Sequence, residues 1–132
     1  MLQSIETLYQ GRLALAQPFI ESVLSYGEIS LTFFGGEYSH TVLKTPKSGD
    51  FRVQEEHGGI IQPIDPDPEV IAFARRSLAA VQSDLLYARV DLVFLENQQP
   101  AIMELELIEP SLYLSYDDES PRRFADAIQA RL

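Results

Sequence analysis

The chain has 132 residues, of which 45% are hydrophobic and 23% charged, and these proportions are typical of one globular domain rather than of a disordered tail. It contains no cysteine, which excludes disulfide frameworks, thiolate zinc sites and cysteine nucleophiles. Twenty acidic residues against ten basic ones give a net charge of -10. A surface this acidic would repel nucleic acid, whereas its carboxylates suit a hard divalent cation such as Mg²⁺ or Ca²⁺.

The N-terminal segment does not resemble a signal peptide, because Glu6 stands where basic residues followed by an apolar stretch would be needed. No run approaches 18 consecutive apolar residues, the length of a membrane-spanning helix. We therefore expect a soluble, cytoplasmic protein with no membrane partner. Residues 1–12 predict a weak helix ending near Gly11, and residues 13–17 predict a short strand stopped by Pro18.

A β-hairpin is predicted next. Residues 29–34 and 38–43 are rich in β-branched and aromatic residues, and they flank the turn Gly35-Gly36-Glu37. His40, in the second of these strands, is expected to be a histidine on the sheet surface. The segment KTPKSGDFRVQEEHGG (44–59) is polar and rich in turn residues, with only 51–53 able to form a short extended piece, so we predict a functional loop.

Two helices and a second hairpin complete the pattern. Asp67 as N-cap and Pro68 at the first helical position predict a helix running to about Gln82. Two strands, 88–95 and 101–107, follow on either side of a polar turn, and a last helix starts at Ser120-Pro121. We therefore predict an α+β fold for residues 1–132, a single domain with a largely antiparallel sheet and two packed helices.

The second hairpin carries three carboxylates on one face. Side chains alternate across a strand, and only one choice of faces buries all of the apolar residues Val90, Leu92, Phe94, Met103, Leu105 and Leu107. That choice places Asp91, Glu104 and Glu106 on the opposite face, within roughly 5 to 8 Å of one another.

Two interpretations of this cluster remain open at this point. At an effective dielectric of about 20, two like charges 4 to 6 Å apart repel by roughly 3 to 4 kcal/mol, and a bound divalent cation would remove that cost. Alternatively, the face is solvated, the side chains splay apart and water screens the repulsion.

Four sequence blocks occur in a recognisable order: AQPFI (16–20), GEISLTFFGGE (27–37), TPKSGDFRVQEEHGG (45–59), and VDLV (90–93) followed by MELELIEP (103–110). Together they resemble the ATP-grasp ligases, including glutathione synthetase, the ribosomal-protein glutamate ligase and the cyclo-ligase of cycloserine biosynthesis. The first two blocks resemble the adenine hinge and its following hairpin. The third is similar to the family segment PxxGExRxNxxxGG, and the last resembles the strand pair whose Asp and Glu-x-Asn hold two Mg²⁺ ions against ATP.

The resemblance implies a role for each matching residue. Asp91, Glu104 and Glu106 would bind Mg²⁺ or Mn²⁺, and Arg52 would contact the transferring phosphate unless it merely pairs with an acidic residue of its own loop, Glu55 or Glu56. The remaining expected binding residues are the backbone of Gln17, Pro18 and Phe19 for adenine, Glu28 for the ribose or a substrate, Gln54 for the metal and phosphates, and His57, Gly58 and Gly59 for the acceptor substrate.

Two departures from the family pattern qualify these expectations. Glu106 stands where the family has Asn, which adds a negative charge to the site. No glycine cluster of the kind that cradles phosphates occurs, so we expect only the C-terminal lobe, with the N-terminal lobe and the substrate domain absent from this chain.

The resemblance therefore implies the ATP- and metal-binding lobe of a carboxylate–amine ligase, incomplete for catalysis alone, with ATP, Mg²⁺ and a small-molecule carboxylate as its ligands. The alternative is a truncated, stand-alone domain that binds or oligomerises without turnover. In either case a chain without its partner lobe would expose the apolar floor of the ATP cleft. Exposed apolar surface of this kind promotes self-association, so we expect a homodimer.

Overall fold

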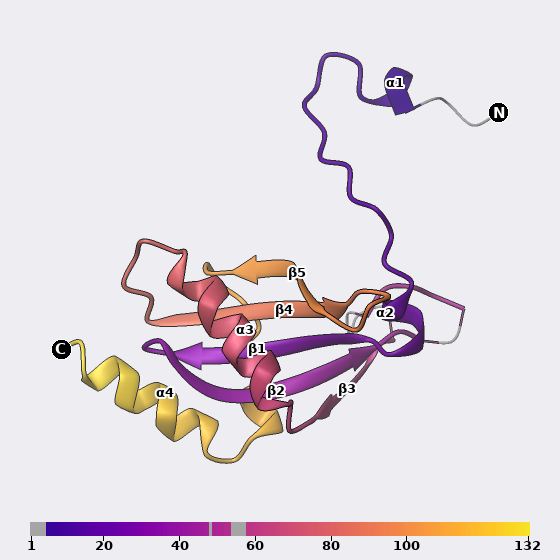
Figure 1. The fold of residues 1–132 in the computed structure, drawn as a ribbon. Helices are drawn as coiled ribbons and strands as arrows, with labels where there is room; N and C mark the ends of the chain where they lie inside the picture. The colour runs from indigo at the N-terminus through magenta and orange to yellow at the C-terminus, as the bar shows by residue number, and fades with distance from the viewer. Residues whose placement is uncertain (1–4, 48, 54–57) are drawn as a thin grey trace.

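The computed structural model describes residues 5–47, 49–53 and 58–132. Within these ranges one antiparallel sheet has the strand order β3-β2-β1-β4-β5 (Figure 1). Its strands are β1 (Glu28–Phe34), β2 (Glu37–Thr45), β3 (Ile60–Pro63), β4 (Tyr87–Phe94) and β5 (Pro100–Glu106). The helices are α1 (Ile5–Leu8), α2 (Ser22–Ser25), α3 (Pro68–Ala79), α4 (Ser120–Gln129) and the short 3₁₀ helix η2 (Leu114–Tyr116). The expected α+β class and both hairpins are confirmed.

Helix α3 crosses one face of the sheet and closes the main hydrophobic core (Figure 1). Asp67 caps the helix as predicted, because its side chain accepts a hydrogen bond from the backbone N–H of Glu69 at 2.9 Å. The helix packs Val70 and Ala74 against every second residue of the two central strands. The buried members of this core are Ile29, Leu31, Phe33, Val70, Ala74, Val90 and Leu92.

The opposite face of the sheet is unusual because polar side chains are buried in it. Strand β1 is buried along its whole length, so the residues that alternate with its core positions are covered as well. Helix α4 covers one end of this face by stacking Phe124 on Phe34, with the ring centroids 4.8 Å apart. The buried polar residues of the central strands on this face are Glu28, Ser30, Thr32, His40, Lys44, Arg89 and Asp91.

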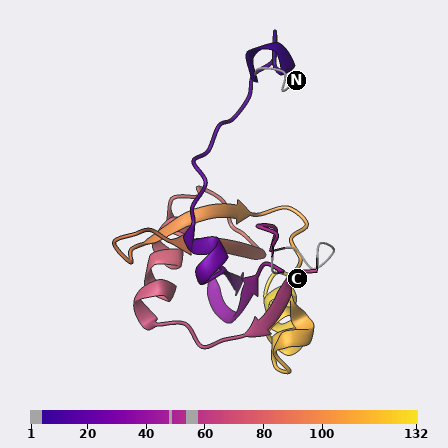
Figure 2. The same ribbon diagram turned by 90° about the vertical axis from the view of Figure 1, so that its right-hand side faces the viewer.

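The N-terminal segment differs from the prediction. Residues 13–20 form no strand, and the chain runs away from the sheet to the single turn of α1 (Figures 1 and 2). An extended segment becomes a strand only when a neighbouring strand bonds its backbone, and no described strand pairs with these residues. Leu13 and Leu15 are almost fully exposed as a result. None of the described helices combines the length and apolarity that crossing a bilayer requires.

Candidate metal and nucleotide site

The carboxylate cluster predicted on the second hairpin is present. Asp91 on β4 lies directly opposite Glu104 on β5, and Arg89 lies opposite Glu106. One carboxylate oxygen from each of Asp91, Glu104 and Glu106 lies within 4.8 Å of the others. Asp91 is completely buried, Glu106 is half-buried and Glu104 is exposed, so the cluster extends from the floor of the site to solvent.

A β-bulge displaces one residue from its predicted place. The register shifts after the pair Asp91–Glu104, so that Leu92 lies opposite Ile102 and Met103 has no partner. Met103 therefore packs with Val93 on the face of the carboxylates, and its assignment to the main core was wrong. Strict alternation along β5 could not reveal the extra residue.

Two buried cations hold the carboxylates, and neither was predicted from the sequence. The Arg89 guanidinium donates from Nε to Asp91 Oδ1 at 2.9 Å and from Nη2 to Oδ2 at 2.8 Å, and it also pairs with Glu106. Lys44 on β2 donates from Nζ to Asp91 Oδ2 at 3.1 Å and pairs with Glu28. Arg89 and Lys44 are 5% and 4% exposed. The burial of Arg89 could have been suspected from the sequence, because Arg89 stands two positions before Asp91 in a strand that is otherwise mostly apolar.

Burial and charge shift the pKa values of these groups in opposite directions. Burial alone would raise the pKa of Asp91, but its hydrogen bonds from Arg89 and the charge of Lys44 outweigh burial and hold that pKa below its usual value. Burial would lower the pKa of Lys44, yet the charges of Asp91 and Glu28 raise it. Burial raises the pKa of both Glu28 and Glu106, against the opposing effects of their cationic neighbours.

The cluster carries an excess of negative charge. Among the described residues that form it, the four carboxylates of Glu28, Asp91, Glu104 and Glu106 face only the two cations Lys44 and Arg89. Carboxylate oxygens are the ligands that Mg²⁺ prefers. The donor chemistry and the uncompensated charge therefore fit a divalent cation.

A pocket of about 310 Å³ adjoins the cluster on the same face. It brings together five of the residues predicted to bind nucleotide, although they are distant in sequence: Gln17, Pro18, Phe19, Glu28 and Arg52. The bulged Met103 also lines this pocket and accepts a hydrogen bond at Sδ from Gln17 Nε2 at 3.1 Å.

The structure places the predicted site residues of the loop before β3 differently. Arg52 is half exposed and pairs with Asp50, from Nη2 to Oδ2 at 2.7 Å, and the hydrogen bonds from Arg52 hold the pKa of Asp50 well below its usual range. Gly58 and Gly59 precede β3 and are not among the lining residues of the 310 Å³ pocket. Gln54 and His57 lie outside the described residues, as do Glu55 and Glu56.

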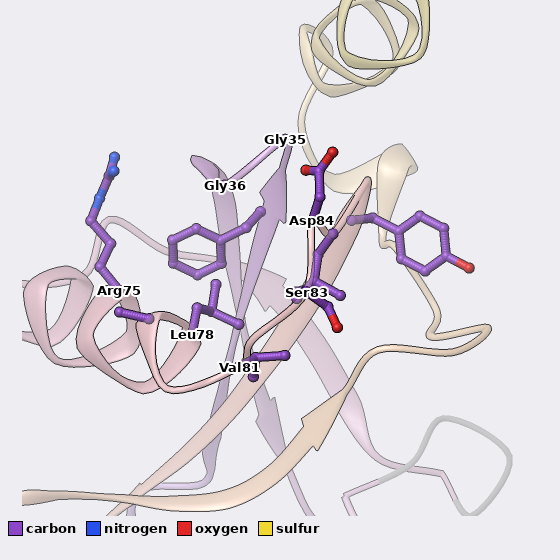
Figure 3. Close-up of a pocket in the computed structure, with 12 residues that line it drawn as sticks. Gly35, Gly36, Arg75, Leu78, Val81, Ser83 and Asp84 are labelled. Carbon is purple, nitrogen blue, oxygen red and sulfur yellow. The ribbon is translucent and has the colours of Figure 1, made fainter. Parts of the chain in front are cut away.

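A different pocket, of about 380 Å³, lies at the opposite end of β1, between α3 and the β1–β2 turn (Figure 3). Its charged residues are engaged in ion pairs, Arg75 with Glu37 and Asp84 with Arg131. None of the residues predicted to bind ATP or metal lines it.

Comparison with known proteins finds relatives of this chain. No family model matches the chain, but it is 37% identical over 132 residues to the cycloserine biosynthesis protein DcsG of Streptomyces lavendulae. The crystal structure of D-cycloserine synthetase DcsG superimposes with a TM-score of 0.75 at 36% identity, covering 87% of this chain and 41% of that one. The ATP-grasp ligase PsnB, in a complex with Mg and ADP, shares the fold with a TM-score of 0.58 at 15% identity, covering 80% of this chain and 33% of PsnB.

This chain is a relative of the ATP-grasp ligases. The sequence match to DcsG covers 95% of this chain but only 44% of DcsG, so the chain spans less than half the length of that relative. The D-alanine–D-alanine ligase of Bacillus anthracis, in a complex with ATP, shares the fold at a TM-score of 0.52 and 20% identity, over 77% of this chain and 35% of its own. The chain therefore matches only part of the length of each of these proteins.

In this ATP-grasp relative, residues 111–113 lie over the carboxylate face. The carbonyl of Ser111 accepts from Arg89 Nη1 at 3.2 Å, and the carbonyl of Leu112 is bonded to His40 Nε2 at 2.9 Å. His40 is only 5% exposed. The expectation of a surface histidine was wrong because the segment after β5, distant in sequence, covers it.

Proposed function

We propose that this chain forms the C-terminal ATP- and metal-binding lobe of an ATP-dependent carboxylate–amine ligase of the ATP-grasp type. The observation that carries the proposal is the position of the carboxylate cluster beside the 310 Å³ pocket, on one face of the sheet. The cluster has the chemistry for Mg²⁺, and the pocket has the lining for a base. The sequence identity to DcsG supports the same family of reactions.

The metal ligands in this proposal are Asp91, Glu104 and Glu106, with Mg²⁺ or Mn²⁺ as the ion. Glu104 is exposed and no described cation pairs with it, so its oxygens are available to an incoming ion. Asp91 is held by Arg89 and Lys44, which fix its carboxylate on the floor of the site. A bound Mg²⁺ would neutralise phosphate oxygens and orient the γ-phosphate for transfer.

The nucleotide base in this proposal occupies the pocket lined by Gln17, Pro18 and Phe19. The ring of Phe19 and the thioether of Met103 present polarisable apolar surfaces to a planar base. Glu28, on the same wall, can accept a hydrogen bond from a ribose hydroxyl or contact a substrate.

Arg52 is the residue we propose to contact the transferring phosphate. Its partner in the structure is Asp50, in an ion pair whose guanidinium is half exposed. Exposed ion pairs contribute little stability, so exchanging Asp50 for a phosphate group costs little. A planar guanidinium with several N–H donors suits the spread charge of a phosphoryl group during transfer. Gln54, His57, Gly58 and Gly59 remain proposed contacts of the metal, phosphates and acceptor.

The proposed reaction has two steps. The γ-phosphoryl group of ATP is transferred to a substrate carboxylate oxygen, which gives an acyl phosphate and ADP. An amine then attacks the acyl carbon, the bond to phosphate breaks and the amine loses a proton, leaving an amide-type bond and free phosphate. We propose that this chain supplies only part of the cleft and depends on a further ATP-grasp lobe for turnover.

A non-catalytic, oligomeric binding protein is the second candidate, and one observation favours it. The segment carrying Leu13 and Leu15 runs away from the sheet with both leucines exposed. Exposed apolar surface of this kind favours association. A homodimer through this segment is compatible with loss of turnover and with retained nucleotide binding.

Calorimetric titration with Mg²⁺–ATP tests the proposed function, and Glu104→Gln is the most informative variant. The substitution removes one metal-ligating charge from an exposed residue, so we expect about tenfold weaker Mg²⁺–ATP binding with an unchanged melting temperature. Glu96→Gln is the matched control, because Glu96 is an exposed acid in the turn of the same hairpin. Absence of binding by the unsubstituted protein, or equal affinity of both variants, contradicts the proposal.

A further inference from the structure

The segment Ser111–Tyr113 is hydrogen-bonded to side chains from two strands of the sheet, β4 and β2. Arg89 on β4 donates to the carbonyl of Ser111, and His40 on β2 is bonded to the carbonyl of the next residue, Leu112. Two adjacent carbonyls are thus fixed by side chains that are 49 positions apart in the sequence. Such a pair of anchors leaves the following residue little freedom.

That following residue, Tyr113, adopts a strained backbone conformation. Its φ of 50° and ψ of 36° lie in the left-handed region, which non-glycine residues occupy at an energetic cost. Conformations of this kind persist where surrounding contacts enforce them, and they concentrate at functional sites. Here the enforced conformation accompanies a Tyr113 ring whose centroid lies 5.4 Å from Cζ of Arg89.

The Arg89 guanidinium is consequently held on several sides. Its in-plane donors are directed to both oxygens of Asp91, to Glu106 and to the Ser111 carbonyl, while the ring of Tyr113 packs against it. A guanidinium attracts an aromatic face through the ring quadrupole, most strongly when both are partly removed from water.

We propose that Tyr113, anchored through His40, is a positioning residue that locks Arg89 onto Asp91 and Glu106. The inference rests on the proposed function in one respect, because the site that Tyr113 organises is the proposed Mg²⁺–ATP site. With the ring in place, Arg89 pairs with Asp91 and Glu106 and not with Glu104. The exposed carboxylate of Glu104 then stays uncompensated and open to a cation.

Loss of the ring has a defined electrostatic consequence. Glu104 and Glu106 lie on the same face of β5, and an oxygen of each lies within 4.8 Å of the other. In this inference a guanidinium released from Tyr113 gains Glu104 as a second acceptor beside Glu106. Arg89 already pairs with Asp91 and Glu106, so an arginine that also paired with Glu104 would occupy the one carboxylate of the three that no described cation holds. Tyr113 therefore acts on metal binding through Arg89 and not through contact with the ion.

Proton exchange at Arg89 Nε, followed by NMR on the full chain without ligand, tests this inference directly. We expect Tyr113→Leu to speed the exchange about fivefold, because one stabilising contact of the guanidinium is lost. Tyr113→Phe keeps the ring and should match the unsubstituted protein. Tyr87→Leu is the control, since it removes a ring that packs on Phe124 and lies outside the site.

Titration with Mg²⁺ alone supplies the second measurement. Tyr113→Leu should bind Mg²⁺ about fivefold more weakly and Tyr113→Phe normally, while Tyr87→Leu should lower only the melting temperature. Should Tyr113→Leu fail to fold, His40→Gln replaces it, and the same loosening of Arg89 is expected from loss of the anchor. Unchanged Nε exchange in these variants overturns the inference. Altered exchange without any Mg²⁺ binding by the unsubstituted protein overturns the proposed function and leaves the positioning role standing.

Discussion

Asp91 shows how one residue serves both folding and the proposed chemistry. Its carboxylate is fully buried, and it remains charged because Arg89 and Lys44 contact it from two strands. Removing one member of such a buried charged group strongly lowers the stability of the folded state, because its partners are left as unpaired charges inside the protein. Asp91 is therefore a poor choice for probing metal binding alone, which makes the exposed Glu104 the better probe.

Substituting Asp91→Asn should lower the free energy of unfolding by about 3 to 5 kcal/mol, since two buried cations lose their shared counter-charge. Urea denaturation at neutral pH measures this difference. Asp50→Asn is the control, because its partner Arg52 is half exposed and little stability should be lost. A loss below about 1 kcal/mol for Asp91→Asn would show that the three charges are not mutually dependent.

The stability difference between the unsubstituted protein and Asp91→Asn should depend on pH. The pKa of Asp91 is lower in the folded chain than its ordinary value of 3.8, so the folded state favours the ionised form. The stability due to that preference is present above the ordinary value and is lost as the pH falls through the lower, folded pKa. The stability difference between the unsubstituted protein and Asp91→Asn should therefore shrink below about pH 4 in denaturation series. A difference that stays constant down to pH 2 contradicts the assignment.

At the scale of elements, the start of β1 is tightly constrained by its approach to β2. Gly27 has a φ of +104°, and a Cβ at this position would lie 2.4 Å from the carbonyl oxygen of Lys44. The next residue, Glu28, pairs with Lys44 across the strands. The close approach of the two strands, which only glycine permits here, places the Glu28 and Lys44 side chains together on the floor of the site.

We expect Gly27→Ala to lower the free energy of unfolding by about 2 to 3 kcal/mol, because backbone strain and a clash with backbone add together. Gly36→Ala is the matched control: its φ is +82°, but no atom lies within 4 Å of the added Cβ. Strain alone should cost that variant about 1 kcal/mol. Urea denaturation distinguishes the two, and equal losses would contradict the close approach described for Gly27.

Local sequence signals predicted the two hairpins and the starts of α3 and α4, but not β3, α2, the unpaired N-terminal segment or the cross-strand details. The double-glycine turn gave the first hairpin, and Asp67-Pro68 gave the start of α3. Alternation placed Asp91 and Glu104 on one face, but it could not show the bulge that turns Met103. Lys44 and His40 were missed as buried groups because their partners are distant in sequence, and burial of this kind is a property of the packed sheet.

At the scale of the whole molecule, the N-terminal segment is the least integrated part. Leu13 and Leu15 contribute nothing to either hydrophobic cluster of the described residues. The match to DcsG includes 95% of this chain but 44% of that relative. We therefore propose that these leucines are covered in an assembly, either by a further ATP-grasp lobe or by a second copy of this chain.

Light scattering coupled to size-exclusion chromatography tests the second of these arrangements. The double variant Leu13→Ser/Leu15→Ser should raise the dimer dissociation constant by at least about tenfold, since two apolar side chains no longer gain from burial. Its melting temperature should be unchanged, because neither leucine packs on the sheet. Leu132→Ser is the control, as an equally exposed leucine at the other terminus. A concentration-independent monomer in all cases would exclude the homodimer.

The graded burial of the three acidic groups has a kinetic consequence. The innermost carboxylate is already oriented by two cations, while the outermost one faces bulk water. In the proposed metal site, an ion arriving from solution would meet Glu104 first and shed its hydration stepwise toward the interior. Loading and release would then proceed at the rim, without separating the strands.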